Sequence, residues 1–369
     1  MVVLADQRKK ILKVLMISLL LDLISFTFIL PLFPSLLSFY RTRDPSPNAP
    51  LNRIFHYLNA YKNSFAKPID SRYDIVLLGG ALGSLFSLLQ AIAAPFIGRL
   101  SDKHGRRTAL LCSMIGNTLS VALWVAATDF RTFLASRVVG GLSEGNVQLA
   151  HAIATDISEP SQRGSTMALV GACFSIAFTC GPALGAYLSS VTTVKENPFA
   201  TAAGVSLLLI VVETIYIYIC LPETHPRLTK LQKSSSPKKT PTPSNRAPPR
   251  NHKRTHTNNL ALLNTLHLLF LLPFSGMEFS LPFLTATFYT STTASPSALN
   301  GRLLSTMGLI ASILQGSLVR RLPPLLTIRI GVVAATISFF LLARVQSLLG
   351  LYIAASFLAV TSATVVTGL

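Results

Sequence analysis

The sequence GRLSDKHGRR, residues Gly98 to Arg107, stands between two long apolar stretches and decides how the rest of the chain is interpreted. Ten residues are too few for a domain, so the apolar segments must reverse direction across a short connection. Glycine adopts backbone conformations that other residues avoid, and we therefore expect Gly98 and Gly105 to supply the freedom for a sharp turn. The basic residues of this stretch, Arg106 and Arg107 among them, predict a cytoplasmic connection, since positive charge beside membrane helices stays on that side.

The composition of the 369 residues is that of a polytopic membrane protein. Hydrophobic residues make up 50% of the chain and charged residues only 12%, whereas soluble domains carry about 25% charged residues. The mean hydropathy is +0.52. Apolar stretches of roughly 20 residues recur from Val14 onward, which is the length of a membrane-spanning helix. The sequence lacks the polar alternation of membrane β-barrel strands, so we expect an all-α fold.

Ten membrane helices are predicted. Their expected ranges are 14–40, 74–97, 108–128, 131–154, 164–190, 199–221, 259–289, 301–319, 325–346 and 348–369. With the N-terminal residues 1–13 in the cytoplasm, about two thirds of the 32 Lys and Arg residues fall in cytoplasmic segments. The charge distribution therefore agrees with the positive-inside rule and predicts a cytoplasmic N-terminus.

The predicted helices form two groups. Residues 14–221 contain six of them, with residues 41–73 as an extracytoplasmic loop, and residues 259–369 contain four. The segment between the groups, residues 222–258, is rich in proline, serine and basic residues and cannot bury a core, so we expect a disordered basic cytoplasmic linker. The last apolar stretch ends at Leu369 without a polar flank. Because two-halved transporters repeat one plan, we expect the second bundle to be C-terminally incomplete by two helices.

Several classes of protein are excluded by the sequence. The net charge of +18 does not indicate nucleic-acid binding, because the basic residues are scattered over the connections between spans. The four cysteines lie in or beside apolar stretches and predict packing residues rather than disulfides or zinc ligands. The sequence contains no nucleotide-binding loop, metal-ligand cluster or nucleophile motif. We therefore expect neither an enzyme nor a cofactor or metal site.

Residues 98–107 match the pattern G-x-L-x-D-x-x-G-R-[KR], and in this the chain resembles the major facilitator superfamily. The resemblance implies two helical bundles around a midplane site. It also implies that Asp102 contacts a helix N-terminus of the second half, where the helix dipole stabilises a carboxylate, and that Arg106 joins a charge network closing the inward face. The gating motif would then comprise Gly98, Asp102, Gly105, Arg106 and Arg107. The alternative is that these charges only orient the connection.

Further segments resemble branches of the same family. Leu21-Asp22 with Pro31-Leu32-Phe33-Pro34 is similar to the first helix of drug and proton antiporters. Gly181, Pro182 and Gly185 form a G-P-x-x-G core, which kinks the fifth helix of antiporters and lets a neighbour pack closely. Residues 136–146, SRVVGGLSEGN, and 274–284, FSGMEFSLPFL, resemble the tetracycline-transporter-like (TETRAN) branch, which is regarded as organic anion transporters.

Ionisable side chains within the expected helices are candidates for substrate or proton handling, because they are costly at bilayer depth. Arg137 and Glu144 are seven residues apart and share one face of the fourth helix. Arg137 is permanently charged, so it either pairs with an acid such as Asp22 or binds an anionic substrate. A purely structural ion pair is the alternative. The candidate substrate or proton pathway comprises Asp22, Arg137, Glu144 and Glu278.

Two further acids differ in the role that we expect. Glu278 lies between Pro273 and Pro282, and helices broken by proline expose backbone carbonyls that serve as ligands or hinges. Glu213, in the sixth expected helix, has no partner evident in the sequence; in the family that the chain resembles this helix is often peripheral, which implies that Glu213 lies close to an interface.

The sequence therefore predicts a secondary transporter of small organic solutes, with organic anions or drugs as candidate substrates and proton-coupled antiport as the candidate mode. The competing hypothesis is a transport-incompetent membrane protein that binds partners, or a truncated gene product, because Asp102 would lack the helix against which it closes. The expected partners are a small-molecule substrate, protons and the lipid bilayer, without nucleic acid. We expect a monomer in the plasma membrane or an organelle membrane.

Overall fold

The computed structural model describes residues 5–43, 50–64, 74–159, 162–194, 196–225, 260–288, 295–317, 319 and 322–366. All regular secondary structure in these ranges is helical, which confirms the predicted all-α membrane fold. Nine of the described helical segments are long and apolar enough to span a bilayer. A tenth crossing is formed by two shorter helices that follow one another, so the structure agrees with six spans before the linker and four after it.

The first group of helices comprises α1 (Ala5–Thr27), η1 (Leu30–Leu32), α2 (Phe33–Arg43), α3 (Pro50–Asn63), α4 (Asp74–His104), α5 (Arg106–Val125), α6 (Phe130–Ser143), α7 (Asn146–Ile157), α8 (Arg163–Ser190) and α9 (Ala200–Cys220). The second group comprises α11 (Leu260–Phe288), α12 (Pro296–Ser317), α13 (Pro324–Ala343), α14 (Leu348–Thr361) and η5 (Ser362–Val366). Residues 226–259, most of the predicted linker, lie outside the described residues.

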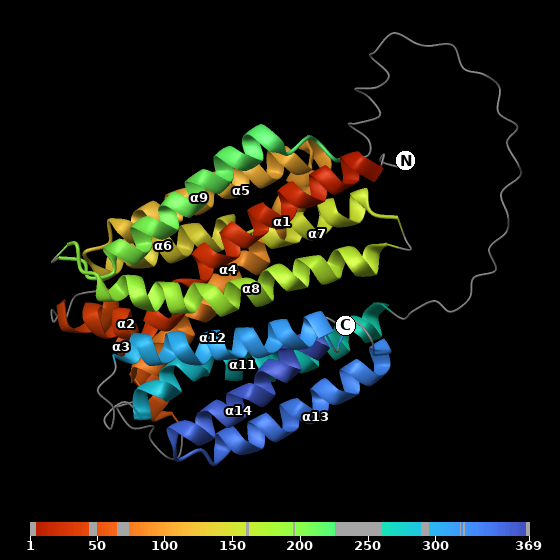
Figure 1. Ribbon diagram of the computed structural model, residues 1–369. Coiled ribbons are helices and arrows are strands. Elements are labelled where there is room, and N and C mark those ends of the chain that lie inside the picture. Colours follow the sequence, from red (N-terminus) through yellow and green to blue (C-terminus); the bar gives the residue numbers. More distant parts are fainter. Residues whose placement is uncertain are drawn as a thin grey trace, which may run out of the picture.

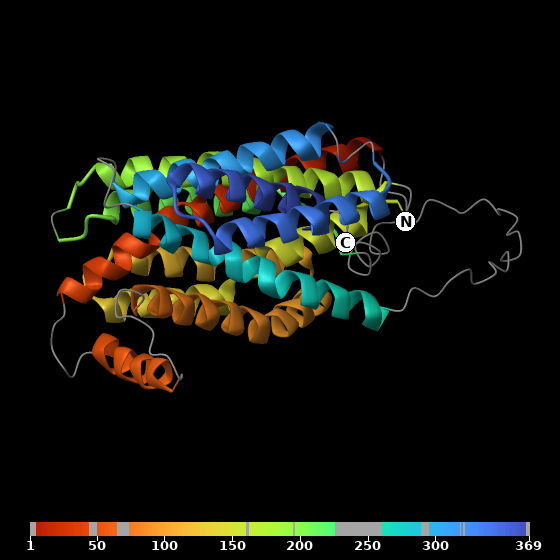
Figure 2. The same cartoon turned by 90° about the horizontal axis from the view of Figure 1, so that it is seen from below.

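The long helices run side by side, with the first group above the second in Figure 1. We call the end that holds residues 98–107 the motif end, on the right of that view, and the other end the opposite end. The predicted loop 41–73 contains α3, which lies at the opposite end (Figure 2) and packs on α4, where Lys62 Nζ donates to Asp74 Oδ1 over 2.9 Å. The sequence analysis did not predict this helix, because its 14 residues are too few to span a bilayer.

Residues 98–107 are not the ten-residue loop that the sequence predicted. α4 continues to His104 and α5 begins at Arg106, so Gly105 alone joins them, with a φ of 102°. Gly98 is helical, and a Cβ at this position would meet nothing within 4 Å. The expected flexibility of Gly98 is therefore wrong, because the whole reversal falls on the one residue with a left-handed backbone.

The first and fourth predicted spans are both broken. Span 14–40 consists of α1, η1 and α2; it begins earlier, at Ala5, and is interrupted where Pro31 has no N–H to donate. Span 131–154 is divided into α6 and α7 by Glu144, with an extended ψ of 92°, and Gly145. A Cβ on Gly145 would stand 2.8 Å from Ile97 Cγ2, so glycine allows α4 to lie against the break.

The two groups meet along α8 and α12. A Cβ on Gly308 of α12 would stand 2.4 Å from the backbone nitrogen of Thr179, so the helices touch backbone to backbone. On another side of α8, a Cβ on Gly185 would stand 2.4 Å from Phe28 O. Small residues permit such close approach between membrane helices. The G-P-x-x-G segment of α8 thus lies between α1 of the first group and α12 of the second.

A second contact between the groups lies toward the opposite end. Asn300 of α12 donates to Pro31 O over 3.3 Å and to Pro282 O over 3.0 Å. Phe33 of α2 packs edge-on against Phe283 of α11, with ring centroids 6.3 Å apart. These contacts tie the broken start of the chain to the first two helices of the second group.

Candidate functional site

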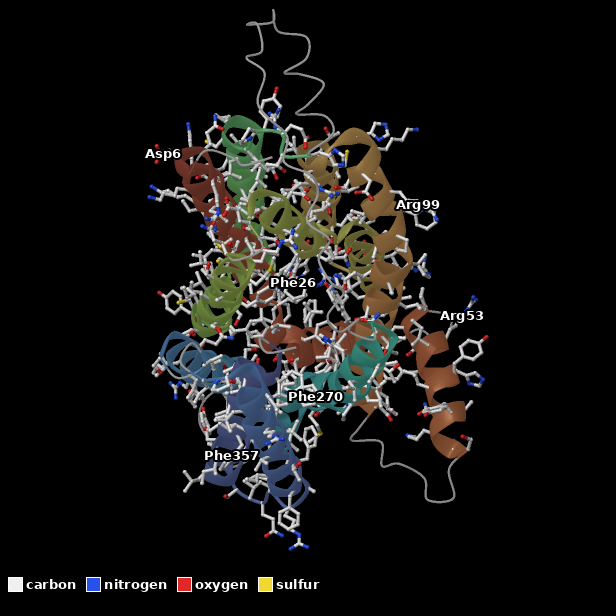
Figure 3. All side chains as sticks on the ribbon, turned by 90° about the vertical axis from the view of Figure 1, so that its right-hand side faces the viewer. Asp6, Phe26, Arg53, Arg99, Phe270 and Phe357 are labelled. Carbon is white, nitrogen blue, oxygen red and sulfur yellow. The ribbon has the colours of Figure 1, made fainter. Side chains whose placement is uncertain are left out.

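A small, partly open cavity with several polar side chains in its wall lies inside the first group of helices. The residues that line it come from α1, α4, α5, α6 and α9, together with Ile29 just before η1 and Glu144 at the α6–α7 break. Its polar lining residues are Asp22, Ser25, Asn117, Ser120, Arg137, Glu144 and Ser206. The volume open to the centres of water molecules is about 40 Å³. Because one water needs about 10–15 Å³ on this measure, the cavity has room for a few waters. Phe26, another lining residue, lies between the two groups in the view onto the motif end (Figure 3).

Two carboxyl groups of the cavity are held by amide side chains. Asn146 Nδ2, on the first residue of α7, donates to Asp22 Oδ1 over 3.1 Å. Asn117 Nδ2 of α5 donates to Glu144 Oε2 over 3.0 Å. Glu144 occupies the break between α6 and α7, and Asp22 is 4% exposed. The break thus places Glu144 and Asn146 on the cavity side from two consecutive helices.

Arg137 reaches the same cavity without a carboxylate partner. Its side chain is buried, its Nη2 donates to Ser136 Oγ over 3.1 Å, and its Nε has no hydrogen-bond partner. The guanidinium instead lies beside three aromatic rings, with centroid distances of 5.5 Å to Phe133, 6.0 Å to Phe86 and 6.0 Å to Trp124. Among the described residues, neither Asp22 nor Glu144 forms an ion pair with Arg137. The structural ion pair considered for Arg137 is therefore not present.

Glu213 lies at the contact of α9 with α1. It is 1% exposed in α9, and its Oε1 accepts a hydrogen bond of 2.8 Å from Ser18 Oγ of α1. One step further along the same contact, the Oγ atoms of Ser25 and Ser206 lie 2.6 Å apart. The spacing of seven residues places both partners on one face of each helix, but the sequence alone does not say that these two helices pack together.

Glu278 is not brought to this cavity. It lies half-buried in α11 and is absent from the cavity lining. It has no hydrogen-bond or ion-pair partner within the ranges that the structure describes. Its assignment to the transport pathway stays a prediction, while the structure groups Asp22, Arg137 and Glu144.

A network of charged groups joins three helices at the motif end. Arg106 Nε donates to Asp156 Oδ2 of α7 over 2.8 Å, and its Nη1 donates to Asp102 Oδ1 of α4 over 2.7 Å. Nη1 also donates to Ser101 Oγ over 2.9 Å. Arg106 therefore joins a charge network, all of whose described members belong to the first group. The expected contact of Asp102 with the second half stays a prediction.

The carboxylate at a helix N-terminus is that of Glu223, which the sequence analysis did not single out. Glu223 Oε1 accepts from the backbone nitrogen of Arg106 over 2.9 Å, and its Oε2 accepts from that of Arg107 over 3.3 Å. The backbone nitrogens of Thr224 and His225 also donate to Oε1, at 2.9 and 2.8 Å. The first N–H groups of a helix need such acceptors, and the dipole favours a negative one. Glu223 thereby attaches the end of α9 to the start of α5.

Broken helices, a cavity lined by charged and polar side chains, and two groups of helices joined by glycine contacts are typical of a polytopic membrane transport protein. The chain belongs to the Major Facilitator Superfamily, whose sequence model matches residues 15–369. This is a family of transporters rather than enzymes, and the resemblance carried by residues 98–107 is confirmed.

Individual relatives agree with this membership. Major facilitator superfamily domain-containing protein 10 of Mus musculus is 36% identical over 335 residues, which cover 87% of this chain and 69% of that protein. The crystal structure of the human organic anion transporter MFSD10 (TETRAN) matches with a TM-score of 0.75 and 29% identity, covering 98% of this chain and 84% of that one. Tetracycline resistance protein, class C, of Escherichia coli is 34% identical over 133 residues, 35% of this chain and 33% of that protein. The likeness to the TETRAN branch is thus confirmed, whereas the structure and these matches give no support to missing helices, which stay a prediction.

Proposed function

We propose that the chain moves small organic anions across a membrane by alternating access and couples this movement to protons. The observation that carries the proposal is Arg137, a buried cation that lines the cavity and has no ion-pair partner among the described carboxylates. Aromatic faces accommodate a cation but do not neutralise it. A buried charge that forms no ion pair is costly, so an anion that pairs with it directly is favoured. The human relative, which is an organic anion transporter by name, supports the same substrate class.

Alternating access is supported by the size of the cavity and by the breaks beside it. A volume of about 40 Å³ is far below the roughly 300–1,000 Å³ of pockets that hold organic ligands. An organic anion therefore needs helices to separate before it reaches Arg137. Both helix breaks, at Pro31 and at Glu144, adjoin the cavity and supply positions where such a movement can bend a helix.

Proton coupling is supported by the two carboxyl groups beside Arg137. A bound anion and two ionised carboxylates in one small cavity would repel one another. Binding of protons to Asp22 and Glu144 and binding of an anion to Arg137 therefore favour each other. This electrostatic argument favours symport of anion and proton over the antiport expected from the sequence.

The test is uptake of a fluorescent organic carboxylate by liposomes that contain the full-length chain. Arg137→Gln should lower uptake about ten- to hundredfold, because a charge-assisted hydrogen bond contributes roughly 1.5–3 kcal/mol. Arg131→Gln is the matched control, since Arg131 lies on the same helix and is exposed. Arg131→Gln should leave uptake unchanged.

Two results would contradict the proposal. Equal uptake by Arg137→Gln and the wild type would remove Arg137 from anion recognition. Uptake of cationic or neutral drugs without uptake of any anion would reject the substrate class. A pH gradient imposed in either direction distinguishes symport from antiport, and indifference to both gradients would reject coupling.

A further inference from the structure

The contact between α1 and α9 carries two pairs of polar side chains, two helical turns apart. Ser25 pairs with Ser206 through their Oγ atoms at 2.6 Å, and Ser18 donates to Glu213 at 2.8 Å. Seven residues separate the pairs in both antiparallel helices, so both pairs lie on the contacting faces. Asp22 lies one turn from Ser18 on α1. We call these five residues, Ser18, Asp22, Ser25, Ser206 and Glu213, the polar seam.

The polar seam extends from the cavity toward the motif end. Asp22, Ser25 and Ser206 line the cavity, whereas Glu213 does not. Glu213 is seven residues beyond Ser206 in α9, which is about 10 Å at the rise of an α-helix. It therefore continues the row of polar groups from the cavity in the direction of residues 98–107.

Glu213 lacks compensation for a negative charge. It is 1% exposed, and its Oε2 has no hydrogen-bond partner. The charged groups that act on it are the acids Asp22 of α1 and Glu144 at the α6–α7 break. On α8 the nearby titratable group is Cys173, whose Sγ contacts Met16 O. At the start of α5, Arg106 and Arg107 hydrogen-bond at the motif end, to Asp156 and to Tyr218 O, and not to Glu213. No cation in the described parts of the chain hydrogen-bonds to Glu213.

We propose that Glu213 is a proton-binding site and that a proton passes between Asp22 and Glu213 along the polar seam. An ionised carboxylate buried without a cation or sufficient hydrogen bonds is so costly that the group takes up a proton instead. In the structure Ser18 is bonded to Glu213 and Asp22 to Asn146, so the passage requires the Ser18 hydroxyl to turn toward Asp22. The transfer is then balanced: the hydroxyl gives its proton to Glu213 and receives one from Asp22, so one O–H bond breaks for each that forms. The role in coupling rests on the function proposed above, whereas the presence of a proton on Glu213 does not.

The proton itself is tested by infrared spectroscopy of the purified full-length chain. Glu213→Gln keeps the side-chain size and the acceptor for Ser18, but it removes one carboxyl group. We expect the wild type to show a protonated-carboxyl stretch at neutral pH that Glu213→Gln lacks. Glu159→Gln is the control, because Glu159 is exposed, and it should keep the band. Identical carboxyl spectra of wild type and Glu213→Gln would overturn the inference.

The passage of the proton is tested in liposomes. Exchange of labelled anion at equal pH should persist in Glu213→Gln, whereas accumulation driven by a pH gradient should fall to the level measured without a gradient. If the gradient drives wild type and Glu213→Gln equally, proton passage through Glu213 is overturned and the proposed function stands. If the pH gradient does not change anion accumulation by the wild type, proton coupling and proton passage through Glu213 are both rejected. The infrared band then decides whether Glu213 binds a proton.

A second variant covers failure of Glu213→Gln to fold. Ser18→Ala keeps the acid but removes the hydrogen bond to it, so the carboxyl band should shift in frequency. Ser206→Ala alters the other pair of the seam and should leave the band in place. An unshifted band in Ser18→Ala would assign the proton to another carboxyl and overturn the inference.

Discussion

Gly105 and Gly98 stand in the same stretch of ten residues but have different backbone conformations. Gly105 has a φ of 102°, and a Cβ there would stand 2.2 Å from Glu223 Oε2. Gly98 is helical, with open space at its Cβ position. We expect Gly105→Ala to lower the free energy of unfolding by about 1–3 kcal/mol, because a left-handed backbone is strained for alanine.

Thermal unfolding of the detergent-solubilised chain measures this difference, and Gly98→Ala is its control. Alanine is favoured over glycine within a helix by about 1 kcal/mol, so Gly98→Ala should leave the melting temperature unchanged or raise it. Equal loss of stability in the two variants would contradict the assignment of the reversal to Gly105.

One physical rule selected the candidate residues of the pathway. The cost of charge in a bilayer pointed to Asp22, Arg137, Glu144 and Glu278, and the structure places the first three around one cavity but not Glu278. Glu213 and Glu223 depended on facts that a single sequence does not contain. The position of Glu213 requires knowing that α9 packs on α1, and that of Glu223 requires knowing that α9 ends beside the start of α5.

Breaks in helices were harder to predict than the helices themselves. Hydropathy locates a span by its length, but it is insensitive to one or two residues with non-helical backbone. The break at Pro31 had a signal in its missing N–H, whereas that at Glu144 depends on packing of Gly145 against Ile97. Both breaks adjoin the cavity, so the candidate site lies at the positions of the helices that hydropathy predicts least well.

The contact of α12 with α8 depends on Gly308, because the atoms that face it on α8 are backbone atoms. A Cβ on Gly308 would stand 2.4 Å from the backbone nitrogen of Thr179. Because backbone atoms cannot rotate away, Gly308→Ala should force the helices apart and cost about 1–3 kcal/mol, the usual range for overpacking. Gly316, two turns further along α12, has nothing within 4 Å of its Cβ position.

Chemical unfolding of the two alanine variants in mixed micelles checks this contact. Gly308→Ala should unfold at lower denaturant concentration than the wild type, and Gly316→Ala should not. If both variants matched the wild type, the backbone contact between α8 and α12 would not contribute to stability.

At the scale of the whole molecule, the contacts between the two groups of helices are not distributed evenly along their length. The charge network of Asp102, Arg106 and Asp156 and the carboxylate of Glu223 lie within the first group. Contacts that cross between the groups are those of α8 with α12 and the cluster around Phe33, Asn300 and Phe283 toward the opposite end. The described hydrogen bonds of the family motif therefore all lie within the first group.

The contact toward the opposite end is expected to depend most on Phe283. This side chain is 4% exposed, its ring covers Gly79, and it meets Phe33 across the two groups. An aromatic pair contributes about 0.5–1.5 kcal/mol beyond its buried area, and 1.4 kcal/mol is a tenfold change in an equilibrium. Phe283→Ala should therefore raise hydrogen exchange of residues 74–83 about tenfold by favouring separation at this end. Phe96→Ala is the control, because Phe96 is an exposed residue of α4, the helix that contains residues 74–83; it should leave their exchange unchanged. Equal exchange in the wild type, Phe283→Ala and Phe96→Ala would show that the cluster does not hold the groups together.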